Sequence, residues 1–253
     1  MRITGPISVS GDVITSRNIV DRAHYYSSIS TGQKSPLINM LSSLALQLIQ
    51  IVRDANLPLK LNLINAVQQM GAERHLFFYA PGDSLTAQFV GATAMPPTDF
   101  ISVVDMNMGS EKADFGVYRS VDYHVTLLAD GSAVANLTIV YNNTCFWDYK
   151  LFQTVLVPPG AELMNATTSA QDFNGPLSTG DAKFSAFSTS VRVPANEADT
   201  ITYLYMLHHV VSPSGVQERY DLYVQKQAGI NEYNFNPVVQ LPNGAQVLTI
   251  SKR

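Results

Sequence analysis

The chain has 253 residues, of which 46% are hydrophobic and 14% charged, a composition that suits a folded protein with a sizeable core and excludes an intrinsically disordered one. Its 16 basic and 20 acidic residues give a net charge of -4 without a stripe of lysine and arginine, so nucleic acid is not expected as a partner. The single cysteine, Cys145, excludes a disulfide within the chain.

The first segment predicts a strand and two helices. Ile7–Val9 is typical of a short strand, a turn follows at Gly11-Asp12, and Thr15 or Ser16 can cap a helix by accepting hydrogen bonds from its first free amides. A second helix is predicted over Pro36–Val52, where large apolar residues recur three and four positions apart. This helix also contains Asn39, Ser42, Ser43, Gln47 and Gln50, which favours a core helix over a membrane span.

Helical and extended patterns continue to alternate up to residue 112. A helix is predicted from Pro58, with Gly71 as its C-cap, and a short one from Asp83 or Ser84. The apolar runs in 75–80 and 96–107 predict two buried strands. We therefore expect residues 1–112 to form a mixed α/β domain.

The pattern changes to a period of two after Asp114. Val117–Leu127 alternates with Val117, Arg119 and Val121 on one face, and an Asp-Gly turn leads into a second alternating segment, Ala133–Asn143, so a β-hairpin is predicted. Five further strands are predicted at Tyr149–Val157, Lys183–Val193, Thr200–His209, Gln217–Gln225 and Ala245–Ser251. The predicted fold class is α+β with two domains, in which residues 113–253 form an antiparallel β-sandwich.

Several stretches of the chain resemble, in order, the C-terminal half of a bacterial family, domain-of-unknown-function family four thousand and twelve. They are ITGPISVSGDVIT, GQKSPLINML, RHLFFYAPGD, DFISVVDMNMGSEKADFGVYRSVDYHVTLLADGS, IVYNNT and YDLYVQKQAG. The N-x-G-x-x-K-A-D loop, Asn107–Asp114, is the most specific of these motifs. The resemblance implies an extracytoplasmic envelope protein, anchored by a membrane segment in a first half that this chain does not contain. It implies no activity.

The α/β portion is also similar to the LytR-CpsA-Psr glycopolymer transferases, in which a G-x-V-x-V stretch precedes a helix. That resemblance implies an incomplete transferase domain, because the lipid-phosphate-binding arginines and acids of the family lie mainly in the part that is missing here. On this alternative, a phosphate would be held by cations near the predicted helices, and two or more of them would surround one pocket. The candidates are Arg17, Arg22, Lys34 and Arg74.

The loop between the two predicted domains has the densest set of polar side chains: Asp105, Asn107, Gly109, Glu111, Lys112 and Asp114. A calcium loop requires oxygen ligands at its first, third and fifth positions, but Gly109 takes the fifth and no helix follows. As a hinge, the loop would use a positive φ at Gly109, an Asn107 side chain bonded to its own backbone, and pairing of Lys112 with Asp105 or Asp114. We interpret it as a rigid hinge that binds no metal.

No other pattern predicts catalysis or a cofactor. His208 and His209 are adjacent in a predicted strand and would point to opposite faces, and the sequence has no zinc-ligand spacing, nucleophile elbow or P-loop. Cys145, next to Phe146, is interpreted as a buried structural residue.

Aromatic residues gather in or beside the predicted sandwich strands. They are Phe146, Trp147, Tyr149, Tyr203, Tyr205, Tyr220 and Tyr223. Such residues are interpreted as core or cross-strand pairs, with a carbohydrate-facing cluster as the alternative. We expect a non-enzymatic module of the cell envelope whose partner is a cell-wall polymer or an envelope protein; the alternative is part of a phosphate-linked glycopolymer transferase.

Overall fold

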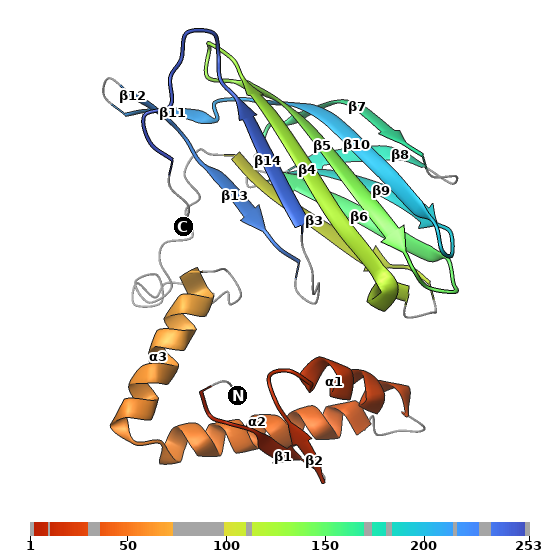
Figure 1. The fold of residues 1–253 in the computed structure, drawn as a ribbon, viewed down its shortest axis with the longest axis vertical. Helices are drawn as coiled ribbons and strands as arrows, with labels where there is room; N and C mark the ends of the chain where they lie inside the picture. The colour runs from red at the N-terminus through yellow and green to blue at the C-terminus, as the bar shows by residue number, and fades with distance from the viewer. Residues whose placement is uncertain are drawn as a thin grey trace. The chain divides into compact units, whose positions relative to one another are not determined.

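The computed structural model has α+β architecture, and the α-helices that it describes lie in the first part of the chain (Figure 1). The chain divides into two compact units, Met1–Thr93 and Ala94–Arg253. The structure describes residues 3–9, 11–29, 36–72, 99–109, 113–169, 174–180, 184–214, 217–227 and 234–250. The strand predicted at 75–80 and the helix predicted from Asp83 or Ser84 lie outside these ranges.

The described residues of the first unit form a β-hairpin and three helices. The strands are β1 (Ile7–Val9) and β2 (Asp12–Ile14), which pair antiparallel, with Gly11 at φ +87 between them. The helices are α1 (Ile19–Ser28), α2 (Pro36–Asp54) and α3 (Leu57–Ala72).

Two local details of this unit differ from the prediction. Helix α1 starts after Asn18, because Thr15 and Asn18 bond to each other instead of to the first turn: Thr15 N–H donates to Asn18 Oδ1 at 2.7 Å, and Asn18 N–H donates to Thr15 Oγ1 at 3.2 Å. Gly71 does not cap α3, which continues through Ala72. A sequence pattern fixes such ends only loosely, because caps depend on side-chain contacts.

The core of the first unit is small and is built from the hairpin and one face of α2. Ile7, Val9 and Ile14 are buried against Met40 and Leu44. Met40 and Leu44 are the buried residues of α2, so the described part of the first unit covers one face of this helix. By length and composition α2 is also long and apolar enough to cross a membrane, a test that core helices of soluble proteins pass as well.

The second unit is a sandwich of two five-stranded sheets (Figure 1). One sheet has the order β14-β4-β5-β10-β7 and the other β13-β3-β6-β9-β8. Their bounds are β3 (Asp99–Asn107), β4 (Val117–Leu127), β5 (Ala133–Asn143), β6 (Tyr149–Val157), β7 (Glu162–Thr168), β8 (Asn174–Gly180), β9 (Ser185–Val193), β10 (Ala198–Leu207), β13 (Leu222–Gln225) and β14 (Asn234–Gln240). A 3-10 turn, η1 (Ala113–Gly116), precedes β4, and a separate hairpin joins β11 (Val211–Ser214) to β12 (Gln217–Tyr220).

The β4–β5 hairpin is confirmed, including its faces. The two strands pair antiparallel from Val117–Asn143 to Leu127–Ala133, and Gly131 has φ +80 in the turn. Alternate residues of β4 from Arg119 to Leu127 are buried. Strict alternation and the turn residues were sufficient to predict this element.

Strand β3 is placed differently from the expectation that it belongs to an α/β domain ending at residue 112. It pairs antiparallel with β6 of the sandwich, from Ser102–Leu156 to Asn107–Leu151. Five consecutive buried residues, Asp99–Val103, fit a strand with neighbours on both sides and cover on its faces. The second compact unit therefore includes β3.

The sheets are also not purely antiparallel. The edge strand β13 runs parallel to β3, and the edge strand β14 runs parallel to β4. The strand predicted at Ala245–Ser251 is absent from the described residues 245–250, and the edge position is taken by β14 instead. Pro237 makes β14 atypical as a strand sequence, and a proline is tolerated there because the strand lies at an edge.

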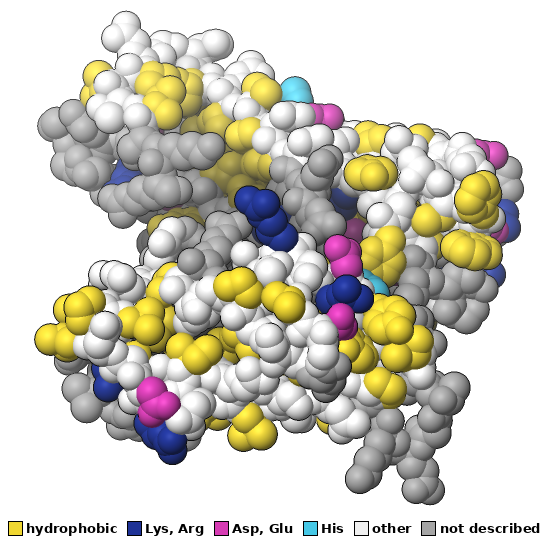
Figure 2. All heavy atoms as spheres, turned by 60° about the horizontal axis from the view of Figure 1, so that its bottom comes forward, with side chains coloured by type: hydrophobic (Ala, Val, Ile, Leu, Met, Phe, Trp, Pro, Cys, Tyr) yellow, Lys and Arg dark blue, Asp and Glu magenta, His cyan; other side chains and the backbone are white. Residues whose placement is uncertain are grey.

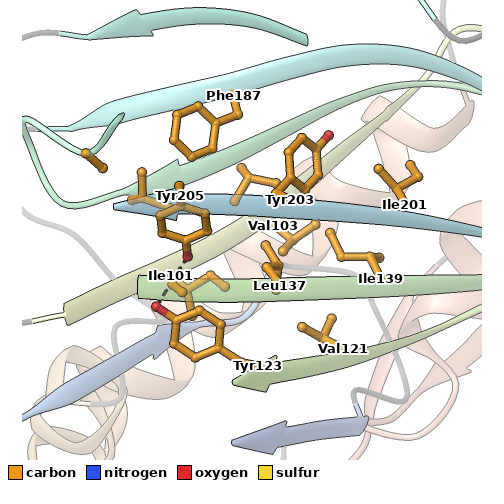
Figure 3. Close-up of a cluster of buried hydrophobic side chains, with 14 of the residues drawn as sticks. Ile101, Val103, Val121, Tyr123, Leu137, Ile139, Phe187, Ile201, Tyr203 and Tyr205 are labelled. Carbon is orange, nitrogen blue, oxygen red and sulfur yellow. Dashed lines mark hydrogen bonds between the residues drawn. The ribbon is translucent and has the colours of Figure 1, made fainter. Parts of the chain in front are cut away.

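The sandwich core contains tyrosines as well as aliphatic residues (Figure 3). Tyr123, Tyr141, Tyr203 and Tyr205 are all fully buried, with their rings among aliphatic side chains such as Ile139. In Figure 3 the hydroxyls of Tyr123 and Tyr205, which come from β4 and β10 of the same sheet, face one another, and Tyr205 donates to Tyr123 at 3.2 Å. Each buried hydroxyl needs such a partner, so the core includes polar networks.

Candidate functional site

The predicted hinge loop begins with an aspartate that points into the sandwich. Asp105 Oδ2 accepts a hydrogen bond from Arg119 Nη1 at 2.5 Å, and Tyr141 Oη donates to Asp105 Oδ1 at 2.6 Å. The Asp105 and Arg119 side chains are 7% and 3% exposed. Asp105 is therefore one member of a buried ion pair between β3 and β4, and its carboxylate is not a ligand presented to solvent.

The network around Asp105 extends through the core. Tyr141 Oη accepts a hydrogen bond from Gln153 Nε2, and Tyr203 Oη donates to Gln153 Oε1 at 2.6 Å. Burial raises the pKa of Tyr141 well above its usual value, and the Asp105 charge raises that pKa further. These tyrosines stay protonated and act as hydrogen-bond donors, which is a structural role.

The backbone of Asp105 is tied to a segment far away in the sequence. Asp105 N–H donates to Gln227 Oε1 at 2.9 Å, and Gln227 Nε2 donates to the Asp105 carbonyl at 2.8 Å. One side chain thus satisfies both main-chain groups of Asp105, and the start of the loop is fixed from two sides.

The rest of the loop closes on itself where the structure describes it. Gly109 N–H donates to Asn107 Oδ1 at 2.9 Å, which is the expected turn, and Asn107 Nδ2 donates to Asp114 Oδ1 at 2.5 Å. Lys112 lies outside the described residues, and the positive φ expected at Gly109 stays a prediction. Among the described residues, no group of three or more His, Cys, Asp or Glu side chains is arranged to hold a metal ion.

The cations proposed to hold a phosphate are described only in part. Arg22 Nη2 lies 3.5 Å from Asp12 Oδ1, and its guanidinium is 5.9 Å from the ring centre of Tyr25. Arg17 is exposed. Lys34 and Arg74 lie outside the described residues. Arg22 is thus paired within the first unit.

His208 and Cys145 have local partners. His208 and His209 lie beyond the end of β10 and not within a strand as predicted; His209 has φ 56, and His208 Nε2 is 3.3 Å from Glu162 Oε1. Cys145 is half-buried, and its thiol donates to the Ala113 carbonyl at 3.2 Å.

A second buried carboxyl group, which the sequence did not single out, lies at the start of β3. Asp99 is fully buried, and its Oδ2 accepts hydrogen bonds from Tyr220 Oη at 2.6 Å and Tyr123 Oη at 2.7 Å. Burial raises the pKa of Asp99, while the two tyrosine donors and the Phe100 amide oppose that shift. The group links β3, β4 and β12 in the core.

Three exposed aromatic side chains of the sandwich, Phe115, Phe146 and Trp147, belong to segments at the end where β3, β5 and β9 terminate. Phe146 is 85% exposed, Trp147 54% and Phe115 48%, and Met108, the residue that follows β3, is 63% exposed. We call these four residues the aromatic end. Phe146 and Trp147 therefore do not have the core role predicted for them, whereas Tyr149, Tyr203 and Tyr205 are buried as expected.

The loop that presents Phe146 and Trp147 is held by the buried side chain of Asn143. Asn143 Nδ2 is within hydrogen-bond distance of the carbonyls of Trp147 (2.8 Å), Val193 (3.1 Å) and Pro194 (3.0 Å). Its Oδ1 accepts from the Cys145 amide at 3.0 Å. One amide side chain thus closes the loop and joins it to the neighbouring loop after β9.

The same loop is attached to η1 and to β9. Thr144 N–H and Oγ1 both donate to the Gly116 carbonyl at 2.8 Å. Asp148 accepts from Arg192 Nη1 and from the Ala195 amide, each at 3.2 Å. A side chain at Gly116 would collide with Cys145 Sγ, so glycine is required for this close approach. The aromatic side chains are therefore presented by a fixed backbone.

Sequence reasoning missed the aromatic end because the aromatic pair Phe146-Trp147 beside a strand is compatible with burial as well as exposure. The NNTCFWD stretch, Asn142–Asp148, did contain a usable signal, since asparagine, threonine and aspartate are the residues that bond to nearby backbone in turns. Aromatics inside such a turn are presented at a loop and not along a strand face.

No protein-family model matches the sequence, and no curated protein is significantly similar to it. Among solved structures, a nutrient-binding protein from Legionella pneumophila is 11% identical over 43% of this chain and 44% of its own, with a TM-score of 0.28. An M1 zinc metallopeptidase from Deinococcus radiodurans is 13% identical over 40% of this chain and 23% of its own, with a TM-score of 0.25.

A GH20 exo-β-N-acetylglucosaminidase from Vibrio harveyi is 11% identical over 42% of this chain and 18% of its own, with a TM-score of 0.21. The chain spans less than half the length of each of these three proteins. At this level of similarity, we draw no conclusion about function from them.

Proposed function

We propose that the chain is a non-enzymatic binding or assembly module of the bacterial cell envelope, and that the aromatic end is its contact surface. The resemblance to domain-of-unknown-function family four thousand and twelve supports an extracytoplasmic location, with anchoring through a segment outside this sequence. The observation that supports binding is the fixed presentation of Phe146 and Trp147, which are 85% and 54% exposed.

Exposed aromatic side chains on a fixed loop favour binding for an energetic reason. Burial of apolar surface is favourable by about 25 cal/mol per Å², and side chains that stay in water do not contribute this free energy. When the loop is already ordered, as the Asn143 bonds make it, a partner that covers these rings recovers that free energy with little loss of conformational entropy. Rigid aromatic anchors are therefore typical of interaction surfaces.

The partner that we propose is a cell-wall polysaccharide. The flat faces of an indole and a phenyl ring suit the apolar C–H face of a sugar ring, and the sugar hydroxyls then need polar partners beside them. Asn196 and Glu197 are exposed in the loop joined to the aromatic end through the Pro194 carbonyl and the Ala195 amide. Their side chains supply an amide and a carboxylate for those hydroxyls.

The alternative, part of a phosphate-linked glycopolymer transferase, has less support. It requires several cations around one pocket to offset the charge of a diphosphate. Of its four candidates, Arg17 and Arg22 are described, and Arg22 pairs with Asp12. We therefore favour the binding module.

Co-sedimentation with purified insoluble cell-wall polysaccharide tests the proposal. We expect the full chain to sediment with the polymer, and Phe146→Ala and Trp147→Ala each to reduce the bound fraction at least about tenfold, as for an interface anchor worth about 1.4 kcal/mol or more. Leu177→Ala, at an exposed apolar residue of β8 (65% exposed), is the matched control and should bind like the wild type. Equal binding by all four proteins, or by none, contradicts the proposal.

A further inference from the structure

Helix α2 has apolar side chains that its contacts with the hairpin leave exposed. One face packs on the hairpin through Met40 and Leu44, and Gln47 Nε2 donates to the Ser8 carbonyl at 2.7 Å. Beside this face, about 100° around the helix axis from Leu44, runs a row of exposed apolar side chains, which we call the α2 row. It consists of Ile38 (63% exposed), Leu41 (44%), Ala45, Ile49 (64%) and Val52 (48%).

The α2 row is symmetric about its smallest member. Leu41 and Ile49 lie four residues before and after Ala45, and Ile38 and Val52 lie seven residues before and after it. Residues four and seven apart share one face of a helix, so the row is continuous. When two copies of such a row meet antiparallel across a two-fold axis at Ala45, each large side chain faces a large one of the other copy.

The absence of charged residues in this part of α2 also favours a second copy of the chain as the partner. Residues 37–52 contain no Asp, Glu, Lys or Arg, so two copies can approach without repulsion between like charges. Arg53 and Asp54 follow, and they pair with each other at 3.3 Å. In Figure 2 the hydrophobic side chains of the visible face are scattered over its surface, with few charged side chains among them. A helix lying on a membrane surface instead typically has a polar face rich in lysine and arginine.

We propose that the α2 row is a homodimer interface, in which α2 of one copy packs antiparallel on α2 of a second copy with Ala45 at the two-fold axis. The small Ala45 side chains let the helix axes approach to about 8 Å. The row is about 21 Å long at 1.5 Å per residue. A contact between single helices of this length is small for a protein interface, so we expect a weak dimer with a dissociation constant on the order of micromolar. This proposal does not depend on the polysaccharide-binding function.

Sedimentation equilibrium of the full chain tests this proposal. Between about 1 and 100 µM protein, a range chosen around the expected micromolar affinity, we expect a monomer–dimer equilibrium. Ile49→Glu should raise the dissociation constant by at least about a hundredfold, since burying an unpaired charge costs several kcal/mol. Leu177→Glu, which puts the same charge at a residue of nearly equal exposure (65%), should leave the dissociation constant unchanged.

A monomeric wild type, or an Ile49→Glu variant that still dimerises, overturns the proposal. Flotation of the wild type with phosphatidylcholine and phosphatidylglycerol vesicles, together with a monomer in sedimentation, would assign the α2 row to a lipid partner instead. A far-ultraviolet circular dichroism melt confirms that each variant is folded.

Disulfide trapping tests the geometry without disturbing the charge. In a Cys145→Ser background, Ala45→Cys should form a disulfide-linked dimer on mild oxidation, because a residue on the axis faces its own copy. Ile49→Cys is the control: its copies would be about 12 Å apart along the antiparallel pair, too far for a disulfide. Equal cross-linking of the two variants contradicts the antiparallel arrangement.

Discussion

Arg119 Nη1 lies 2.5 Å from Asp105 Oδ2, and both side chains are buried in the sandwich. The pair joins the C-terminal part of β3 to the first buried residue of β4. The residues that looked most like an exposed ligand site in the sequence thus include one half of an internal ion pair. Its energetics can be tested directly.

Breaking this pair from either side should strongly destabilise the protein. Asp105→Asn leaves Arg119 charged in the core, and Arg119→Met leaves Asp105 charged there, so each should lower the free energy of unfolding by about 3 to 5 kcal/mol. The double variant should cost less than the sum of the two single variants. Urea denaturation measures all three.

The exposed ion pair of α2 is the control for that series. Arg53 and Asp54 are 71% and 59% exposed, so Asp54→Asn should change stability by less than about 1 kcal/mol. If the single Asp105 and Arg119 variants cost no more than Asp54→Asn, the network around them does not stabilise the sandwich.

The raised pKa of Asp99 predicts that this residue makes the protein less stable as the pH rises. Its pKa in the folded protein is raised above 3.8, so the folded state holds this proton more tightly than the unfolded state does. The stability associated with that proton is present at low pH and is lost as the pH rises from the unfolded pKa through the raised folded pKa. Asp99→Asn stays neutral and should escape this loss.

We therefore expect the stability of Asp99→Asn to increase relative to that of the wild type as the pH rises from about 4 toward neutrality. Over this range the aspartate ionises freely in the unfolded wild type, whereas the folded wild type must lose the proton of Asp99 at a cost in free energy. Guanidinium denaturation at several pH values measures the difference. A difference that is constant, or that falls with rising pH, would show that the Asp99 pKa is not raised.

The hydrogen bonds of Asn143, which hold the loop of the aromatic end, should also stabilise the protein. Asn143→Ala removes the donor to three carbonyls and the acceptor for the Cys145 amide, so we expect a loss of about 2 kcal/mol or more. Thr138→Ala, in the middle of β5, removes one side-chain hydrogen bond to Thr202 and should cost about 1 kcal/mol or less. Thermal unfolding of both variants compares them.

The loop from Asp105 to Asp114 should not bind calcium. Asp105 is committed to Arg119 and Tyr141, and Asn107 to Gly109 and Asp114, so few of its oxygens are available to a cation. The melting temperature in millimolar calcium should therefore equal that in a chelator. Binding at about a hundred times the dissociation constant would instead add about 2.7 kcal/mol, which a melt detects as a rise of several degrees.

The parts of the fold that the sequence could predict are those governed by local pattern. The alternation of β4 and the Asp-Gly turn defined the first hairpin and placed Arg119 on the inward face. Its partner Asp105 could not be deduced, because that requires knowing that β3 joins the sandwich. The same holds for Gln227, which bonds to Asp105 across 122 residues of sequence. Contacts of this range arise from the packing of the sheets.

In the candidate site, too, local sequence pattern could be predicted and long-range contacts could not. Hydrogen-bonding residues around Asn143 indicated a turn, but the turn is fixed by carbonyls of Val193 and Pro194, fifty residues later in the sequence. Whether Phe146 and Trp147 face the core or the solvent depends on that junction. Tyr203 and Tyr205 could be assigned to the core because their spacing of two in a strand puts them on one face.

The fluorescence of Trp147 tests the central claim most directly, because it is the one tryptophan of the chain and belongs to the aromatic end. When soluble fragments of cell-wall polysaccharide are titrated into the full chain, we predict a blue shift of its emission and protection from acrylamide quenching, both saturating with the polymer and both lost in Phe146→Ala. Emission and quenching that do not change at any polymer concentration would contradict the claim that the aromatic end binds the polysaccharide.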